Sequence, residues 1–289
     1  MNYQIDMPGR IRYRSGSTPW LRIESVLVAS LVAALALCMS SCQRQGSSPR
    51  TRDGGPIRAV VTLAPLNSLV SPLLPPDAEI RTLITPGRSE HGFEPTVEDV
   101  LTLERADLVV LIGLGLETSV DRALRRRPLP TRHEARVGEI LGLEGSHAGH
   151  DHDDHSDHDH AVDPHVWLDP VLMKQAMPQL AAMVKVVLNE AGVGSPEEVD
   201  AAAASLICKS EEVDAENRAA LAPFAGRAII THHAAFGRLA ERYGLRVVEV
   251  IRPIEGAEPT PANIAATMEA IKREGVGAIF VEPQFDSTG

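Results

Sequence analysis

The strongest constraint on the fold of this chain is a regular alternation of short apolar runs with segments of helical spacing. The elements expected in the first part are buried strands at 58–63, 80–84 and 106–112 and helices at 64–74 and 96–103. Thr96 followed by Asp99 is typical of a helix N-cap. Strands that alternate with helices favour a parallel sheet with helices on both faces.

The same alternation returns in the last quarter of the chain. The elements expected there are strands at 228–231, 245–251 and 278–281 and helices at 234–243 and 261–274. The run at 278–281 is apolar on both faces, so it should lie within the sheet of the second lobe. A Glu-Pro-Thr tripeptide precedes a helix in each half, at 94–96 and 258–260. The sequence therefore predicts two similar α/β lobes with mostly parallel sheets.

A helix-rich region separates the two predicted lobes. Residues 196–221 are rich in Ala, Glu and Asp, which suits one long helix that joins the lobes. Cys208 lies in this pattern and is expected to be a small buried hydrophobic residue. Open α/β sheets bind ligands beyond the carboxyl ends of their strands, so two facing lobes predict a ligand cleft between them.

The N-terminal segment 1–41 has the features of a bacterial lipoprotein signal peptide. Four arginines precede an apolar stretch at 26–37 that is too short to span a bilayer, and two serines then precede Cys42. Cleavage before Cys42 would leave a lipid-modified cysteine, and the alternative is an ordinary secretory signal cut nearby. Residues 42–56 are rich in Gly, Ser, Pro and Arg and predict a flexible tether.

The formal net charge is -11. Such a chain is a poor candidate for binding nucleic acid or an anionic membrane surface through its own charge. A negative charge suits a cation ligand, although many soluble proteins are also acidic.

The histidines are the residues of this sequence that most clearly indicate a chemical function. Six histidines alternate with acidic residues in one tract, namely His147, His150, His152, His155, His158 and His160. Such a string cannot form a packed core, so it predicts a solvated loop with a shifting set of weak metal sites. The alternative for this tract is a low-complexity spacer.

Three further places present an imidazole at a strand end or a helix start. His91 lies between a predicted strand and helix, His165 lies in the turn-rich run at 163–170, and His232 and His233 follow the strand at 228–231. Three imidazoles with an open or oxygen-filled fourth position suit Zn²⁺. A single histidine of this kind would be interpreted as a hydrogen-bonded surface residue, and His133 receives only that interpretation.

Several motifs in a fixed order resemble the zinc-specific solute-binding proteins of bacterial ABC importers. The matching segments are His-Gly-Phe-Glu-Pro-Thr at 91–96, Gly-Leu-Gly-Leu-Glu at 113–117, the His-rich tract, the run at 163–170, His-Ala-Ala-Phe-Gly at 233–237, Glu-Pro at 258–259 and Val-Glu-Pro-Gln-Phe at 281–285. They extend over nearly everything from Arg58 onward. The order of the set is more specific than any single motif.

This resemblance implies a fold, a ligand set and partners. The fold would be two α/β lobes joined by a long rigid helix, with a Zn²⁺ ion held between them by His91, His165 and His233. A histidine rather than a carboxylate at the third position favours zinc over manganese. The partners would be an ABC permease and its ATPase, reached by a monomer that is lipid-anchored outside the cytoplasm, in the periplasm or on the outer face of a membrane.

The sequence also departs from the family pattern. Ala234 stands where the family has an aspartate after its histidine, and the chain stops at Gly289 where relatives continue through a helix and strand that supply an acidic fourth ligand. On this resemblance the C-terminal lobe is expected to be incomplete. Water or a carboxylate such as Glu282 is then the candidate for the fourth position.

The sequence therefore predicts a non-enzymatic zinc importer component, with two alternatives left open. One alternative is a zinc-dependent hydrolase, and the other is a metal-buffering lipoprotein without a transporter. The expected order is a signal peptide at 1–41, a tether at 42–56, an N-terminal lobe at 57–145, a His-rich loop at 146–162, the end of that lobe at 163–195, a linking helix at 196–222 and a C-terminal lobe at 223–289.

Overall fold

Four parallel strands form the first sheet of the computed structural model, in the order β2-β1-β3-β4. Their bounds are β1 (Arg58–Leu63), β2 (Glu79–Ile84), β3 (Leu108–Leu111) and β4 (His133–Arg136). The two central strands, β1 and β3, are buried along nearly their whole length, as expected for a parallel sheet covered on both faces. The structure describes residues 54–85, 87–143, 162–253 and 258–281.

The helices of the first lobe follow these strands in sequence. They are α2 (Ala64–Val70), η1 (Ser71–Leu73), α3 (Val97–Arg105), α4 (Thr118–Arg126), α5 (Val137–Ile140), η2 (Val166–Leu168) and α6 (Pro170–Ala191). The predicted N-cap of α3 is present as a capping box, in which Thr96 and Asp99 satisfy each other's backbone N–H groups. This cap fixes the end of the loop that joins β2 to α3.

Helix α6 is long and apolar enough to cross a membrane by length and composition alone. Its apolar residues instead pack into the core of the first lobe, where Met177, Leu180 and Val184 are almost fully buried. Asp169 caps its first turn, and Gly192 ends it in the left-handed conformation that glycine adopts without strain.

The second sheet has three parallel strands in the order β6-β5-β7. The elements of this lobe are η3 (Ala222–Phe224), β5 (Ala228–Thr231), η4 (Ala234–Phe236), α8 (Gly237–Tyr243), β6 (Arg246–Val250), α9 (Pro261–Glu274) and β7 (Ala278–Phe280). Its core is small and contains Ile229, Ala240 and Leu245. β7 lies in this sheet as predicted and pairs with β5, and Ile279 is about half exposed, so within the described residues this edge is not covered.

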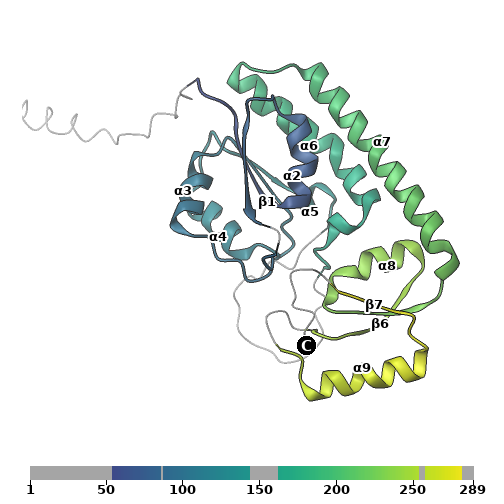
Figure 1. Cartoon of the computed structure of the whole chain (residues 1–289). Helices are drawn as coiled ribbons and strands as arrows, with labels where there is room; N and C mark the ends of the chain where they lie inside the picture. The colour runs from purple at the N-terminus through teal and green to yellow at the C-terminus, as the bar shows by residue number, and fades with distance from the viewer. Residues whose placement is uncertain (1–53, 86, 144–161, 254–257, 282–289) are drawn as a thin grey trace, which may run out of the picture. The chain divides into compact units, whose positions relative to one another are not determined.

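Helix α7 (Pro196–Leu221) is the predicted long connecting helix, and it contacts both lobes (Figure 1). Val199 and Ala203, near its start, belong to the core of the first lobe. Near its end, the Asn217 side chain donates a hydrogen bond to the Tyr243 hydroxyl of α8 at 3.2 Å. The expectation for Cys208 was wrong, because this side chain is exposed on α7 rather than packed in a core.

Three elements of the first lobe were not predicted, namely α4, β4 and α5. The β4 segment is His-Glu-Ala-Arg, which has no apolar run, and it forms the edge of the sheet. Its charged side chains form ion pairs instead of packing in a core: Glu134 accepts from Arg132 at 2.6 Å and from Arg136 at 2.9 Å. Hydrophobic patterning therefore cannot detect this strand.

Candidate metal centre

The first two site residues lie in the loop between β2 and α3. Glu90 is buried, and His91 beside it is partly exposed. The loop is bounded by the buried end of the parallel strand β2 and by the capping box of α3. Both side chains are therefore held at the carboxyl edge of the first sheet, where open α/β folds place their ligands.

The third residue, His165, lies directly before η2 and α6. It is 2% exposed, and its ring packs against that of Trp167 with the ring centres 5.2 Å apart. Pro164 and Pro170 flank this short turn, and the second of them is the first residue of α6. The turn is thereby fixed to the N-terminus of the core helix of the first lobe.

The fourth residue, His233, comes from the second lobe. It follows β5, the central strand of the second sheet, and precedes η4 and α8. Its side chain is 3% exposed. The site is therefore built from groups that belong to both sheets.

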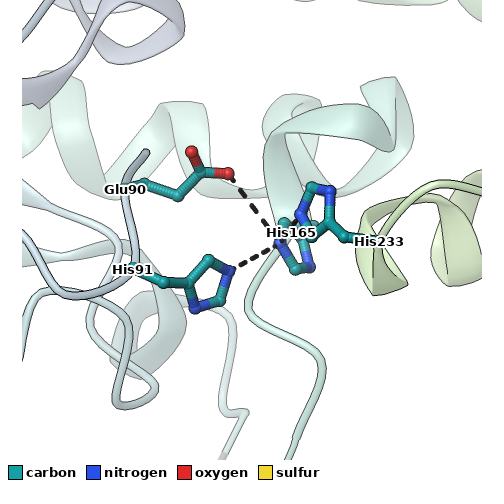
Figure 2. Close-up of side chains that lie close together, drawn as sticks. All are labelled: Glu90, His91, His165 and His233. Atoms are coloured by element: carbon teal, nitrogen blue, oxygen red, sulfur yellow. Dashed lines mark hydrogen bonds and ion pairs between the residues drawn. The ribbon is translucent and has the colours of Figure 1, made fainter. Parts of the chain in front are cut away.

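These four side chains converge on one point (Figure 2). The Nε2 atom of His165 lies 3.1 Å from Nε2 of His91 and 3.3 Å from Nε2 of His233, and one ligand atom from each of the four residues lies within 4.8 Å of the others. Two imidazole nitrogens bound tetrahedrally to one zinc at ~2.0–2.1 Å are about 3.3 Å apart. The spacing of the three imidazoles thus fits one Zn²⁺ ion with little movement.

Asp163 orients the central imidazole. Its Oδ1 atom lies 2.7 Å from Nδ1 of His165 and also accepts the His165 backbone N–H at 3.0 Å. Because the carboxylate only accepts, Nδ1 carries the proton, and Nε2 presents its lone pair to the site. Burial alone would raise the pKa of Asp163, but the hydrogen bonds from His165 and the charge of Arg238 outweigh it and hold this pKa below its usual range.

The structure brings together all three histidines that the sequence singled out as ligands, and it adds Glu90, which was not predicted. The Oε1 atom of Glu90 lies 4.0 Å from Nε2 of His165. Its position directly before His91 in the sequence was the available signal. A carboxylate next to a candidate ligand in the same loop can reach the same ion.

The remaining predicted site residues lie outside the described part of the chain. These are Glu282, the lipidation residue Cys42 and the six histidines of the tract at 147–160. His133 is described and lies away from the site, in β4, where its Nε2 atom is 2.8 Å from Oε2 of Glu190. It is the hydrogen-bonded surface histidine that the sequence indicated.

The sequence of this chain matches a known protein family. Residues 59–288 match the family described as zinc-uptake complex component A, periplasmic, or ZnuA. The chain belongs to the ZnuA family. The family takes its description from a zinc-uptake complex.

Two relatives of this chain are described as a zinc-binding protein and as a zinc uptake protein. The zinc-binding protein AdcA of Streptococcus pyogenes is 29% identical over 249 residues, which cover 81% of this chain and 47% of AdcA. The high-affinity zinc uptake system protein ZnuA of Bacillus subtilis is 28% identical over 261 residues, which cover 89% of this chain and 79% of that protein. The chain thus spans about half the length of the AdcA relatives it matches.

Solved structures share the ZnuA fold. The periplasmic zinc-binding protein TroA of Treponema pallidum aligns with a TM-score of 0.66 at 23% identity and covers 78% of both chains. The Zn(II)-bound ZnuA-like domain of Streptococcus pneumoniae AdcA aligns with a TM-score of 0.61 at 25% identity, over 78% of this chain and 79% of that domain. The predicted fold of two α/β lobes joined by a long helix is confirmed.

Proposed function

We propose that this protein captures Zn²⁺ outside the cytoplasm and delivers it to an ABC-type permease for uptake. The observation that carries the proposal is the convergence of His91, His165, His233 and Glu90, with ligand atoms within 4.8 Å of one another. Membership of the ZnuA family supports the same role.

Zinc is the proposed cargo because of the donor set. Three neutral imidazoles and one carboxylate suit the tetrahedral geometry of Zn²⁺, whereas Mn²⁺ prefers more oxygen ligands. The four donors fill the four positions of a tetrahedral ion. A catalytic zinc site keeps one position for water, so the proposed role is binding and not hydrolysis.

The segments outside the described residues complete the proposed function. Lipidation of Cys42 would hold the protein at a membrane, consistent with a relative that is named a zinc-binding lipoprotein in Streptococcus pneumoniae. The histidines at 147–160 would bind further zinc weakly and raise its local concentration near the ordered site. The partners would be the permease and its ATPase, and the protein would act as a monomer.

A competition titration with a zinc chelator tests the ordered site. His91→Ala, His165→Ala and His233→Ala should each weaken zinc binding by at least about tenfold, since each removes one ligand of a four-donor site. Glu90→Gln should weaken it less, because an amide oxygen still reaches the ion as a poorer donor. His133→Ala is the matched control and should bind like the wild type.

Three outcomes would count against the proposal. Equal affinity in all of these variants would exclude the three histidines as the main ligands. Deletion of residues 147–160 should remove weak sites and leave the tightest calorimetric step intact, so loss of that step would make the tract the main site. Hydrolysis of test esters or peptides by the zinc-loaded protein would contradict the binding role.

A further inference from the structure

Two arginines on α8 contact the segment that carries His165. They are Arg238 and Arg242, one helical turn apart, and α8 begins shortly after His233. The same stretch of the second lobe therefore carries a proposed zinc ligand and two cations that contact the first lobe. The ligand assignments of the proposed function do not include these arginines.

Arg238 holds the start of the His165 turn. Its Nε and Nη2 atoms donate to the backbone carbonyl of Asp163 at 2.9 and 2.6 Å. The contact is close, since a Cβ atom added to Gly237 would lie 3.1 Å from Oδ2 of Asp163. This is the aspartate that orients the His165 ring, so Arg238 acts on the residue behind the ligand.

Arg242 holds the other end of the same turn. Its Nε and Nη2 atoms donate to Oδ2 of Asp169 at 2.8 and 2.5 Å. The Asp169 side chain is 4% exposed, and its second oxygen accepts the N–H groups of Val171 and Leu172 at the start of α6. A buried carboxylate with both oxygens occupied is a fixed anchor, and a guanidinium fork that donates through two N–H groups matches it in geometry.

We infer that Arg238 and Arg242 are positioning residues that hold His165 and His233 at ligand spacing before the metal arrives. This inference rests on the proposed zinc-binding function. The two arginines contact both ends of the seven-residue turn from Asp163 to Asp169. His165 lies in this turn, and its Nε2 atom is 3.3 Å from Nε2 of His233. Preorganised ligands bind more tightly because less ordering remains to be done on binding.

The test uses Arg238→Gln, Arg242→Gln, the double variant and the conservative Arg242→Lys. Arg246→Gln is the matched control, because Arg246 lies in the same lobe and pairs with Glu274 rather than with the His165 turn. The measurements are zinc affinity by chelator competition, the visible spectrum of the Co²⁺-substituted protein and the thermal midpoint of the metal-free protein. The affinity and the spectra are recorded at a temperature well below the thermal midpoint of every variant.

The double variant should bind zinc at least about tenfold more weakly, as is typical when groups that orient metal ligands are lost. Its Co²⁺ spectrum should change in intensity and shape, since the ligand geometry is less uniform. Arg242→Lys should bind zinc more tightly than Arg242→Gln, because the lysine keeps a positive charge near Asp169. Arg246→Gln should match the wild type in both zinc affinity and Co²⁺ spectrum.

Wild-type affinity and an unchanged Co²⁺ spectrum in the double variant would overturn the positioning role. A loss of affinity that only follows partial unfolding, and that Arg242→Lys does not recover, would overturn it as well. Either result leaves the proposed function standing as long as the wild type binds zinc. Failure of the wild-type protein to bind zinc would instead reject the proposed function itself.

Discussion

At the scale of single residues, Asp163 links the electrostatics of the site to its geometry. The carboxylate contacts both the ring Nδ1 and the backbone N–H of His165, and α8 holds its backbone in turn. The tautomer of the central imidazole is therefore set by the protein before any metal binds. An ion that arrives meets a lone pair on Nε2 that already points into the site.

Replacement of Asp163 by Asn should weaken zinc binding by about ten- to a hundredfold, the usual cost of losing a carboxylate behind a metal-bound histidine. The amide no longer supplies a negative charge, and it can present N–H to the ring and favour the wrong tautomer. Asp200→Asn, which alters an exposed pair with Lys185, is the control. Titration of both variants with zinc provides the measurement, and equal affinities would contradict the role of Asp163.

The three proposed ligand histidines could be selected from the sequence because each lies beside a recognisable strand end or helix start, in a motif of the resembled family. Glu90 could not be selected in the same way, because acidic residues are common in loops and only the folded chain shows that this one is buried beside His165. The proposed positioning role of the two α8 arginines could not be predicted from the sequence either. Arg238 and Arg242 look like ordinary surface residues of an amphipathic helix until the partner segment, about 75 residues away, is in place.

At the scale of the elements, Glu117 joins two parallel strands where they end. Its buried carboxylate accepts the Thr62 hydroxyl of β1 at 2.6 Å and the backbone N–H groups of Ile112 and Gly113, just after β3, each at 3.0 Å. No strand ladder supplies acceptors for those two N–H groups, so the carboxylate takes that place.

Glu117→Ala should lower the free energy of unfolding by at least about 2 kcal/mol, because it leaves two buried donors and one partly buried donor without this acceptor. Glu79→Ala, at an exposed position on β2, should change it by less than about 0.5 kcal/mol. Urea unfolding of both variants and the wild type gives the comparison. Matching midpoints for Glu117→Ala and wild type would show that water or another group satisfies these donors.

The helices and strands were predicted well where their residues follow a clear apolar pattern. They were predicted poorly where charged residues stand in place of apolar ones. The helix at 261–274 and the strands at 58–63 and 228–231 have the expected bounds, because capping residues, glycines and apolar runs mark their ends. β4 was missed since its residues are stabilised by ion pairs along a sheet edge. Burial at Cys208 was mispredicted because an Ala-rich helix has no clear apolar face to reveal which side is covered.

At the scale of the whole molecule, the proposed zinc binding would be coupled to folding. The proposed ligands come from both lobes and are brought together only in the folded chain, so zinc that binds the native state would stabilise it by mass action. Free zinc at a thousandfold excess over its dissociation constant should add about 4 kcal/mol to the free energy of unfolding.

His165→Ala should lose most of this stabilisation, and His133→Ala should keep it. Thermal or urea unfolding with and without zinc measures the difference, and the fluorescence of Trp167, which packs against His165, reports on the site directly. A zinc-induced gain in stability that survives in His165→Ala would mean that the stabilising zinc binds elsewhere.

The placement of α8 also bears on how a bound ion leaves. His233, Arg238 and Arg242 lie within ten consecutive residues, so one displacement of that segment withdraws a ligand and both anchors of the His165 turn together. We therefore expect the dissociation rate of a bound ion to depend on the position of this single short helix. A contact that shifts this helix would empty the site in one step, without acting on the other three ligands separately.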